Sequence, residues 1–238
     1  MDAKERLIVA LDVDTREEVE YLVKELKDEV GMFKVGLQLY TSMGNEIVSF
    51  IKGMGGKIFL DLKLHDIPNT VSESVRVLTK LGVDMMNVHS QGGFEMLKQA
   101  KESSVKEAAE LGIKAPLLIA VTILTSLGDE EVSRIGYQKS AKEMVEHLGR
   151  LTQEAGLDGV VCSPLEAGII RDACGPGFIT VTPGVRPAGG DVGDQKRITT
   201  PSKAIAGGST YIVVGRPITK AADVKDAARK IVEEMRNL

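Results

Sequence analysis

The chain has 238 residues, of which 43% are hydrophobic and 27% charged, and its formal net charge is -4. This length fits one α/β barrel or two small domains, and the negative charge without any basic run excludes a surface built for nucleic-acid backbones. No apolar run reaches the ~20 residues that a membrane-spanning helix needs, and the N-terminal apolar stretch is too short for a signal peptide, so we expect a cytoplasmic protein.

Eight apolar runs rich in β-branched residues follow one another along the chain. Most of them lack polar alternation, which predicts strands with both faces buried, as in a parallel sheet. The runs are Leu7–Leu11, Met32–Leu37, Lys57–Leu62, Asp84–His89, Leu117–Leu124, Gly159–Cys162, Phe178–Val181 and Tyr211–Val214.

Amphipathic stretches of helical period lie between most of these runs. They are Arg16–Glu29, Val71–Lys80, Phe94–Glu110, Ser140–Glu154 and Val224–Met235. Thr15 with Glu18 and Ser163 with Glu166 predict capping boxes, and Pro164 and Pro201 suit first helical positions. Glycines shortly before the runs suit left-handed helix ends, at Gly31, Gly56, Gly82, Gly112, Gly156 and Gly208.

The alternation of strands and helices continues without a linker. It predicts one α/β domain over residues 1–238, folded as a closed (β/α)8 TIM barrel, with an open doubly wound sheet as the alternative. Barrel active sites lie at the C-terminal ends of the strands. Polar residues that end the apolar runs are therefore the candidate site residues.

Charged side chains gather at the ends of the first three runs. Asp12 ends the first, Lys34 lies in the second, Asp61 and Lys63 end the third, and Asp66 follows in the next loop. Side chains two apart on a strand share a face, so Asp61 and Lys63 should both point to the barrel mouth. The structural alternative is a buried ion pair that fastens the strand to the loop. Such a pair would not require two aspartates beside two lysines.

Lys63 is the expected catalytic residue of this cluster. Neighbouring carboxylates favour the charged form of a lysine, which argues against a Schiff base and for a general acid or a charge that stabilises a carbanion. His65 and His89 lie nearby in the sequence, but their spacing matches no standard metal site and the lysines would repel a cation. We therefore expect no metal.

Phosphate recognition is expected in the loops after the last two runs, as is common in barrels. The loop TPGVRPAGGDVGDQKR carries Arg186, whose guanidinium can bind phosphate through two nitrogens, and its glycines allow residues 184–196 to move as a lid. In VVGRPI, Gly215 exposes backbone amides and Arg216 adds a second guanidinium. These features indicate a small phosphorylated substrate.

Seven segments carry a resemblance to a known family: LIVALD, FKVGLQLY, DLKLHDIPNT, VTILTS, TPGVRP, DQKR and YIVVGRPI. Over nearly its whole length the chain resembles orotidine 5′-phosphate decarboxylase of the bacterial type, which forms UMP in pyrimidine synthesis. The spacing DxKxxD alone is shared with sugar-phosphate relatives. Its combination with TPGVRP and GDQKR is highly specific.

The resemblance implies decarboxylation of orotidine 5′-phosphate without a metal or other cofactor. Lys63 would donate the proton, within a charged array that includes Lys34, Asp61 and Asp66. Asp66 and Thr70 would reach into the site of a partner subunit, which implies an obligate homodimer.

The resemblance also implies which residues bind the substrate. Asp12 and Lys34 would contact the ribose and Thr125 the pyrimidine, while Gln195 would bridge lid and ligand. Arg186, Gly215 and Arg216 would hold the phosphate.

Two other functions remain open. One is a sugar-phosphate decarboxylase or aldolase that uses Mg²⁺ bound by Asp61 and its neighbours. The other is a phosphate-ligand sensor that kept the pocket without the chemistry, although binding alone would not require a proton donor at Lys63.

Overall fold

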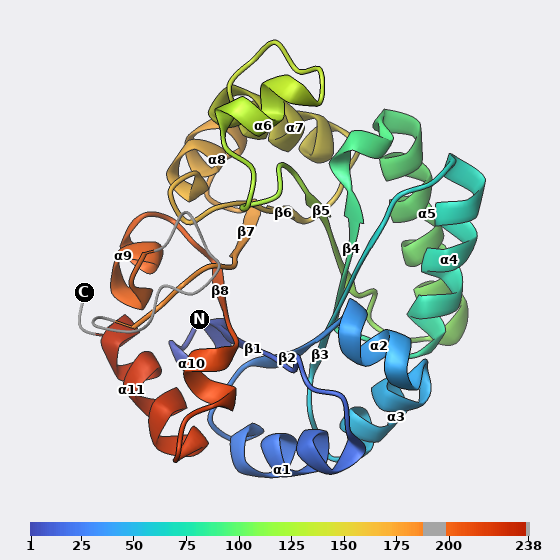
Figure 1. Cartoon of the computed structure of the whole chain (residues 1–238). Coiled ribbons are helices and arrows are strands. Elements are labelled where there is room, and N and C mark those ends of the chain that lie inside the picture. Colours follow the sequence, from blue (N-terminus) through green and yellow to red (C-terminus); the bar gives the residue numbers. More distant parts are fainter. Residues whose placement is uncertain (188–198, 237–238) are drawn as a thin grey trace.

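The computed structural model describes residues 1–187 and 199–236. Eight parallel strands close into a barrel in the order β1 to β8, surrounded by helices (Figure 1). The strands are β1 (Leu7–Ala10), β2 (Met32–Gly36), β3 (Ile58–Leu64), β4 (Met85–His89), β5 (Leu117–Val121), β6 (Gly159–Val161), β7 (Ile179–Thr182) and β8 (Tyr211–Val214). Because β8 pairs with β1, the predicted closed barrel is confirmed and the open sheet is wrong.

The helices lie outside the strands and cover the outer face of the barrel (Figure 1). In the described residues they are α1 (Arg16–Leu26), α2 (Leu37–Met43), α3 (Glu46–Gly53), α4 (Pro68–Lys80), α5 (Phe94–Leu111), α6 (Asp129–Arg134), α7 (Ala141–Glu154), α8 (Ala167–Cys174), α9 (Pro201–Ala206), α10 (Arg216–Thr219) and α11 (Val224–Arg236). None of these helices is long and apolar enough to cross a lipid bilayer.

Two of the predicted helix starts are confirmed. The Thr15 hydroxyl accepts from the Glu18 N–H, and the Glu18 carboxylate accepts from the Thr15 N–H, which makes the capping box of α1. Pro201 is the first residue of α9, where its missing N–H leaves no intrahelical bond unmade.

The predicted helix start at Ser163 is wrong. The Ser163 hydroxyl accepts from the Leu165 N–H, two residues ahead, rather than from the Glu166 N–H that a capping box requires. Glu166 still accepts from the Ser163 N–H at 2.9 Å, so the segment is a turn that contains Pro164. Helix α8 begins only at Ala167.

The six glycines divide into two groups. Four of them have positive φ, as predicted for helix ends: Gly82, Gly112, Gly156 and Gly208. The prediction is wrong for Gly31 and Gly56, which are needed for close packing instead. A Cβ on Gly31 would lie 2.2 Å from the Glu5 carbonyl oxygen, and one on Gly56 would lie 2.7 Å from Cγ2 of Ile51.

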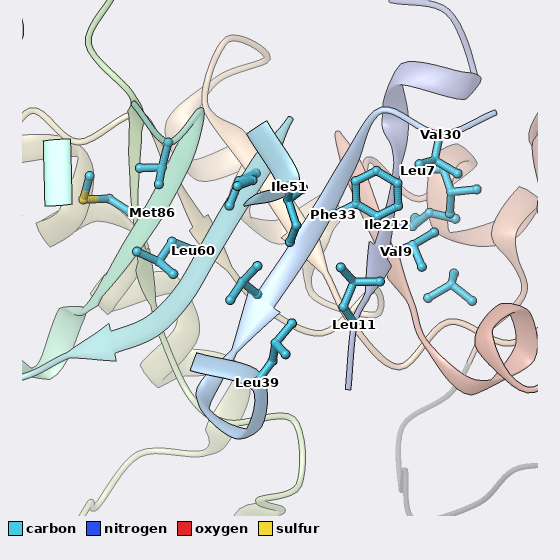
Figure 2. Close-up of a cluster of buried hydrophobic side chains, with 14 of the residues drawn as sticks. Leu7, Val9, Leu11, Val30, Phe33, Leu39, Ile51, Leu60, Met86 and Ile212 are labelled. Carbon is cyan, nitrogen blue, oxygen red and sulfur yellow. The ribbon is translucent and has the colours of Figure 1, made fainter. Parts of the chain in front are cut away.

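The alternation of side chains along each strand builds two apolar layers. Outward-facing residues such as Leu7, Val9 and Ile212 pack against the helices (Figure 2). Inward-facing residues fill the barrel with a second cluster that we call the apolar plug: Ile8, Ala10, Met32, Phe59, Met85, Ile119, Val181, Tyr211 and Val213. Three members of the plug, Phe59, Val181 and Val213, also line a cavity towards the C-terminal ends of the strands.

Candidate active site

Polar side chains lie directly above the apolar plug, at the C-terminal ends of three neighbouring strands. On each strand the polar residue comes two positions after an inward-facing plug residue, so it points into the barrel as well. The pairs are Met32 and Lys34 on β2, Phe59 and Asp61 on β3, and Met85 and Asn87 on β4.

Asp61 is the centre of a hydrogen-bonded ionic network and is only 8% exposed. Its Oδ1 accepts from Lys63 Nζ and from Asn87 Nδ2, each at 2.7 Å. Its Oδ2 lies 3.4 Å from Lys34 Nζ, which in turn lies 3.2 Å from Asp12 Oδ1. The structure thus brings together four of the charged residues singled out in the sequence.

Lys63 has an unusual backbone conformation. Among the described residues it is the only non-glycine residue with positive φ, at 55°. A left-handed conformation costs an L-residue about 1–2 kcal/mol, and the Lys63 N–H donates to Asn87 Oδ1 at 2.8 Å. Strain of this kind persists only where the surroundings enforce it, and it is concentrated at functional sites.

Asn87 and Gly36 belong to this site although the sequence reasoning missed both. Asn87 lies within an apolar run, and the signal that could have found it is the two-residue alternation from Met85. Gly36 leaves room for an ammonium group, because a Cβ there would lie 2.6 Å from Lys34 Nζ. Only the placement of the Lys34 side chain reveals that requirement.

Asp66 and Thr70 stand apart from the network within one chain. Both are exposed, and Asp66 Oδ1 accepts from the backbone N–H of Ile67 at 2.7 Å. Within residues 1–187 and 199–236, Asp66 forms no ion pair with Lys34 or Lys63. The sequence cluster of Asp61, Lys63 and Asp66 is therefore divided in space.

An apolar wall faces the ionic network across a cavity. The wall comes from the ends of β5 to β8 and the residues that follow them, and Thr125 lies on it. The full lining is Lys34, Phe59, Asp61, Lys63, Val121, Ile123, Leu124, Thr125, Val161, Val181, Pro183 and Val213. Such a cavity suits a ligand with one flat apolar face and one charged edge.

The residues expected to bind phosphate follow β7 and β8. Val185 and Arg186 lie next to Thr199, with the Arg186 N–H donating to the Thr199 carbonyl at 2.9 Å. A Cβ on Gly215 would lie 3.7 Å from Asp12 Oδ2, so this glycine borders the ionic network, and the exposed Arg216 comes next. Residues 188–198, including Gln195 and most of the expected lid, lie outside the described residues.

Two histidines stack beside Lys63. The rings of His65 and His89 are 5.2 Å apart with an interplanar angle of 22°. Burial, together with the nearby charges of His65 and Lys63, lowers the pKa of His89 to about 4. His89 is therefore neutral at physiological pH.

This lowered pKa predicts a pH-dependent stability. Between pH 6.5 and 4 the unfolded state binds a proton at His89 and the folded state does not, so stability is full above pH 6.5 and falls as the pH drops to about 4. His89→Phe keeps a stacked ring without the titration. The Tm advantage of the native chain over this variant should shrink from pH 7 to pH 5, whereas exposed His147→Gln should leave the pH dependence unchanged. Parallel Tm curves for native chain and His89→Phe would contradict the prediction.

Fold and site together define a (β/α)8-barrel enzyme with an ionic centre at its C-terminal mouth. Residues 5–231 match the orotidine 5′-phosphate decarboxylase / HUMPS family. The chain belongs to this family and is a carboxy-lyase.

Individual relatives agree with this assignment. The chain is 52% identical to an orotidine 5′-phosphate decarboxylase of Moorella thermoacetica, over 99% of this chain and 94% of the relative. It is 50% identical to one of Syntrophomonas wolfei, over 99% of both. The crystal structure of the enzyme of that name from Lactobacillus acidophilus is similar with a TM-score of 0.85 and 40% identity, covering 98% of this chain and 99% of that one.

Proposed function

We propose that this chain converts orotidine 5′-phosphate to UMP and CO2 in de novo pyrimidine biosynthesis, with Lys63 as proton donor and without a metal or cofactor. The observation that carries the proposal is the Lys63 ammonium held 2.7 Å from Asp61 at the barrel mouth of a chain from this family. The function of its relatives supports the choice of substrate.

The reaction requires a charge where a carbanion forms. Loss of CO2 breaks the bond between C6 and the carboxylate carbon and leaves the electron pair on C6, where no ring carbonyl delocalises it directly. The Lys63 ammonium stabilises this charge and then transfers its proton to C6. Asp61 lies beside the departing carboxylate and raises the energy of the bound substrate by like-charge repulsion.

The donors around Asp61 support a metal-free reaction. One carboxylate oxygen accepts from Lys63 and Asn87, and the other faces the Lys34 ammonium. A magnesium ion would have to displace the two lysine ammonium groups and the Asn87 amide from the Asp61 oxygens, which are the ligands that it prefers to bind. The residues present thus fit a carbanion-stabilising site better than an Mg²⁺ site.

The substrate lies with its reacting edge towards the ionic network and its base against the apolar wall. Asp12 and Lys34 contact the ribose, and Thr125 contacts the pyrimidine. Their positions on the network and on the cavity wall support these roles. The bridging role of Gln195 and closure of residues 184–196 are further parts of the proposal, based on the family resemblance.

Arg186, Gly215 and Arg216 hold the phosphate. Binding energy from this remote group favours a closed site, which excludes water and strengthens the electrostatics around Lys63. Arg216→Ala should therefore lower kcat/KM by about 10²–10³-fold, since it removes a charge-assisted contact to the phosphate. Steady-state kinetics test this, with the surface variant Arg229→Ala as control; a value near that of the native chain would count against the scheme.

The active protein is a homodimer in which Asp66 and Thr70 of each subunit complete the partner's site. Their exposure and their separation from the network of their own chain support this arrangement. The exposed apolar side chain of Ile67, next to Asp66 in the sequence, and that of Leu37 at the start of α2 are suited to burial between subunits.

A spectrophotometric assay of orotidine 5′-phosphate consumption, with EDTA present, tests the function. We expect full activity and one CO2 for each UMP formed. Activity lost in EDTA and restored by Mg²⁺ would favour the metal-dependent alternative. Tight UMP binding in calorimetry without turnover of orotidine 5′-phosphate would favour the sensor.

A further inference from the structure

We propose that Asn87 is a positioning residue that sets both the main chain and the ammonium group of Lys63. Its kinetic consequence rests on the proposed function, whereas its structural consequence does not. Asn87 is 1% exposed and lies on β4, beneath the ionic network.

The ladder between β3 and β4 is irregular at this place. Leu60 pairs with Met86, and the next pair is Leu64 with Val88. Three residues of β3 therefore face only Asn87 on β4, so the backbone groups of that stretch cannot all find ladder partners. The Asn87 side chain takes the place of a ladder partner by accepting from the Lys63 N–H at 2.8 Å.

The chemistry of the contact selects an amide side chain. The Lys63 N–H can only donate and an ionised Asp61 can only accept, so one group must offer both an acceptor and a donor. Asn87 does this with Oδ1 and Nδ2. An aspartate at this position would repel Asp61, and a leucine would leave both groups without their buried partner.

The Asn87 side chain holds both the main chain and, through Asp61, the ammonium group of Lys63. Asn87 holds its left-handed main chain directly, and it orients the Asp61 oxygen that binds its Nζ. A displacement of ~1 Å at a reacting group can cost about 10²-fold in rate. We infer that Asn87 sets the position from which Lys63 reaches C6.

Kinetics of three variants test this role. Asn87→Ala should lower kcat by about 10²-fold while the Kd for UMP changes by less than about threefold, because the phosphate and base contacts remain. Ser90→Ala is the matched control. Ser90 is fully buried on the segment just after β4 and donates to the Val121 carbonyl at 2.6 Å, so its loss costs a buried hydrogen bond away from Lys63.

Asn87→Asp has nearly the same shape and gives a distinctive pH profile. When protonated it can donate to Asp61 and accept from the Lys63 N–H, so its kcat relative to the native chain should recover as the pH falls. The titratable groups around it are Asp61 and Lys63 on β3, Lys34 on β2, and His89 on its own strand with His65 stacked on it, whereas β5 places apolar Ile119 beside it. A purely structural role would lower kcat by one factor at every pH. If Asn87→Ala does not fold, this variant carries the kinetic test.

Amide hydrogen exchange at Lys63 tests the structural part without any substrate. Loss of the Asn87 acceptor should speed exchange of the Lys63 N–H by about tenfold or more, and Ser90→Ala should not. If the native protein does not turn over orotidine 5′-phosphate, but the Lys63 N–H exchanges faster in Asn87→Ala than in the native protein, the proposed function is defeated and the positioning role is still supported. Unchanged exchange in Asn87→Ala, or kcat within about threefold of native in both variants, would overturn the inference.

Discussion

Lys63→Ala should lower kcat for orotidine 5′-phosphate by about 10⁴-fold or more. The substitution removes the proton donor, and it also removes the charge nearest the developing carbanion; general acid catalysis alone contributes up to about 10⁴-fold. The spectrophotometric assay measures the loss, and calorimetry with UMP shows whether the site still binds product. Lys57→Ala is a matched control, because Lys57 is an exposed lysine just before β3, at the opposite end of the same strand.

Lys63→Arg separates the two roles of the ammonium. A guanidinium keeps the positive charge but does not release a proton at neutral pH. It should therefore remain far below the native rate, although above Lys63→Ala if charge stabilisation contributes. Activity of Lys63→Ala within about tenfold of native would show that another group protonates C6.

A mixture of two inactive variants should regain activity if the site is shared between subunits. In a heterodimer of Lys63→Ala and Asp66→Asn, one site combines an intact Lys63 with an intact Asp66 from the partner, and the other site lacks both. Random pairing makes half the dimers mixed, so about a quarter of the native activity should return. Co-expression of the two variants and assay of the purified mixture measure it.

The matched control for this experiment is a mixture of Lys63→Ala with Lys34→Ala. Both lysines lie in the network of one chain, so every site in every dimer lacks one of them. No activity should return. Equal recovery in the two mixtures, or none in the first, would show that Asp66 does not act across subunits.

Local spacing along the chain determined the barrel and most of the charged site. Strands buried on both faces read as continuous apolar runs, and the two-residue alternation is a property of any strand. We could therefore predict the eight strands from the sequence alone, without knowing which residues touch in the folded chain. The same holds for the placement of Asp61 and Lys63 on the inner face. The family resemblance added the roles of Thr125 and Gln195 and the expectation that Asp66 and Thr70 reach a partner subunit, which no periodicity supplies.

Contacts between strands were decided by the tertiary structure alone. Asn87 is uncharged and lies within an apolar run, so only its two-residue distance from Met85 marks it in the sequence, and its importance comes from Asp61, 26 residues away. Gly31 was misjudged for the same reason, since the atoms that exclude a Cβ there belong to the distant Glu5, whereas Gly56 meets Ile51 of the preceding helix and Phe33 of β2. Such requirements depend on the distance between chain segments.

The ionic network shows where the two kinds of information meet. Its charges stand at strand ends, where the sequence alone places them. The register shift between β3 and β4 decides two further features of the network. These are the choice of the Asp61 oxygen that binds Lys63 and the positive φ of Lys63. Periodicity is encoded within each strand, whereas register is the joint result of packing two strands and their helices, so only the folded barrel determines it.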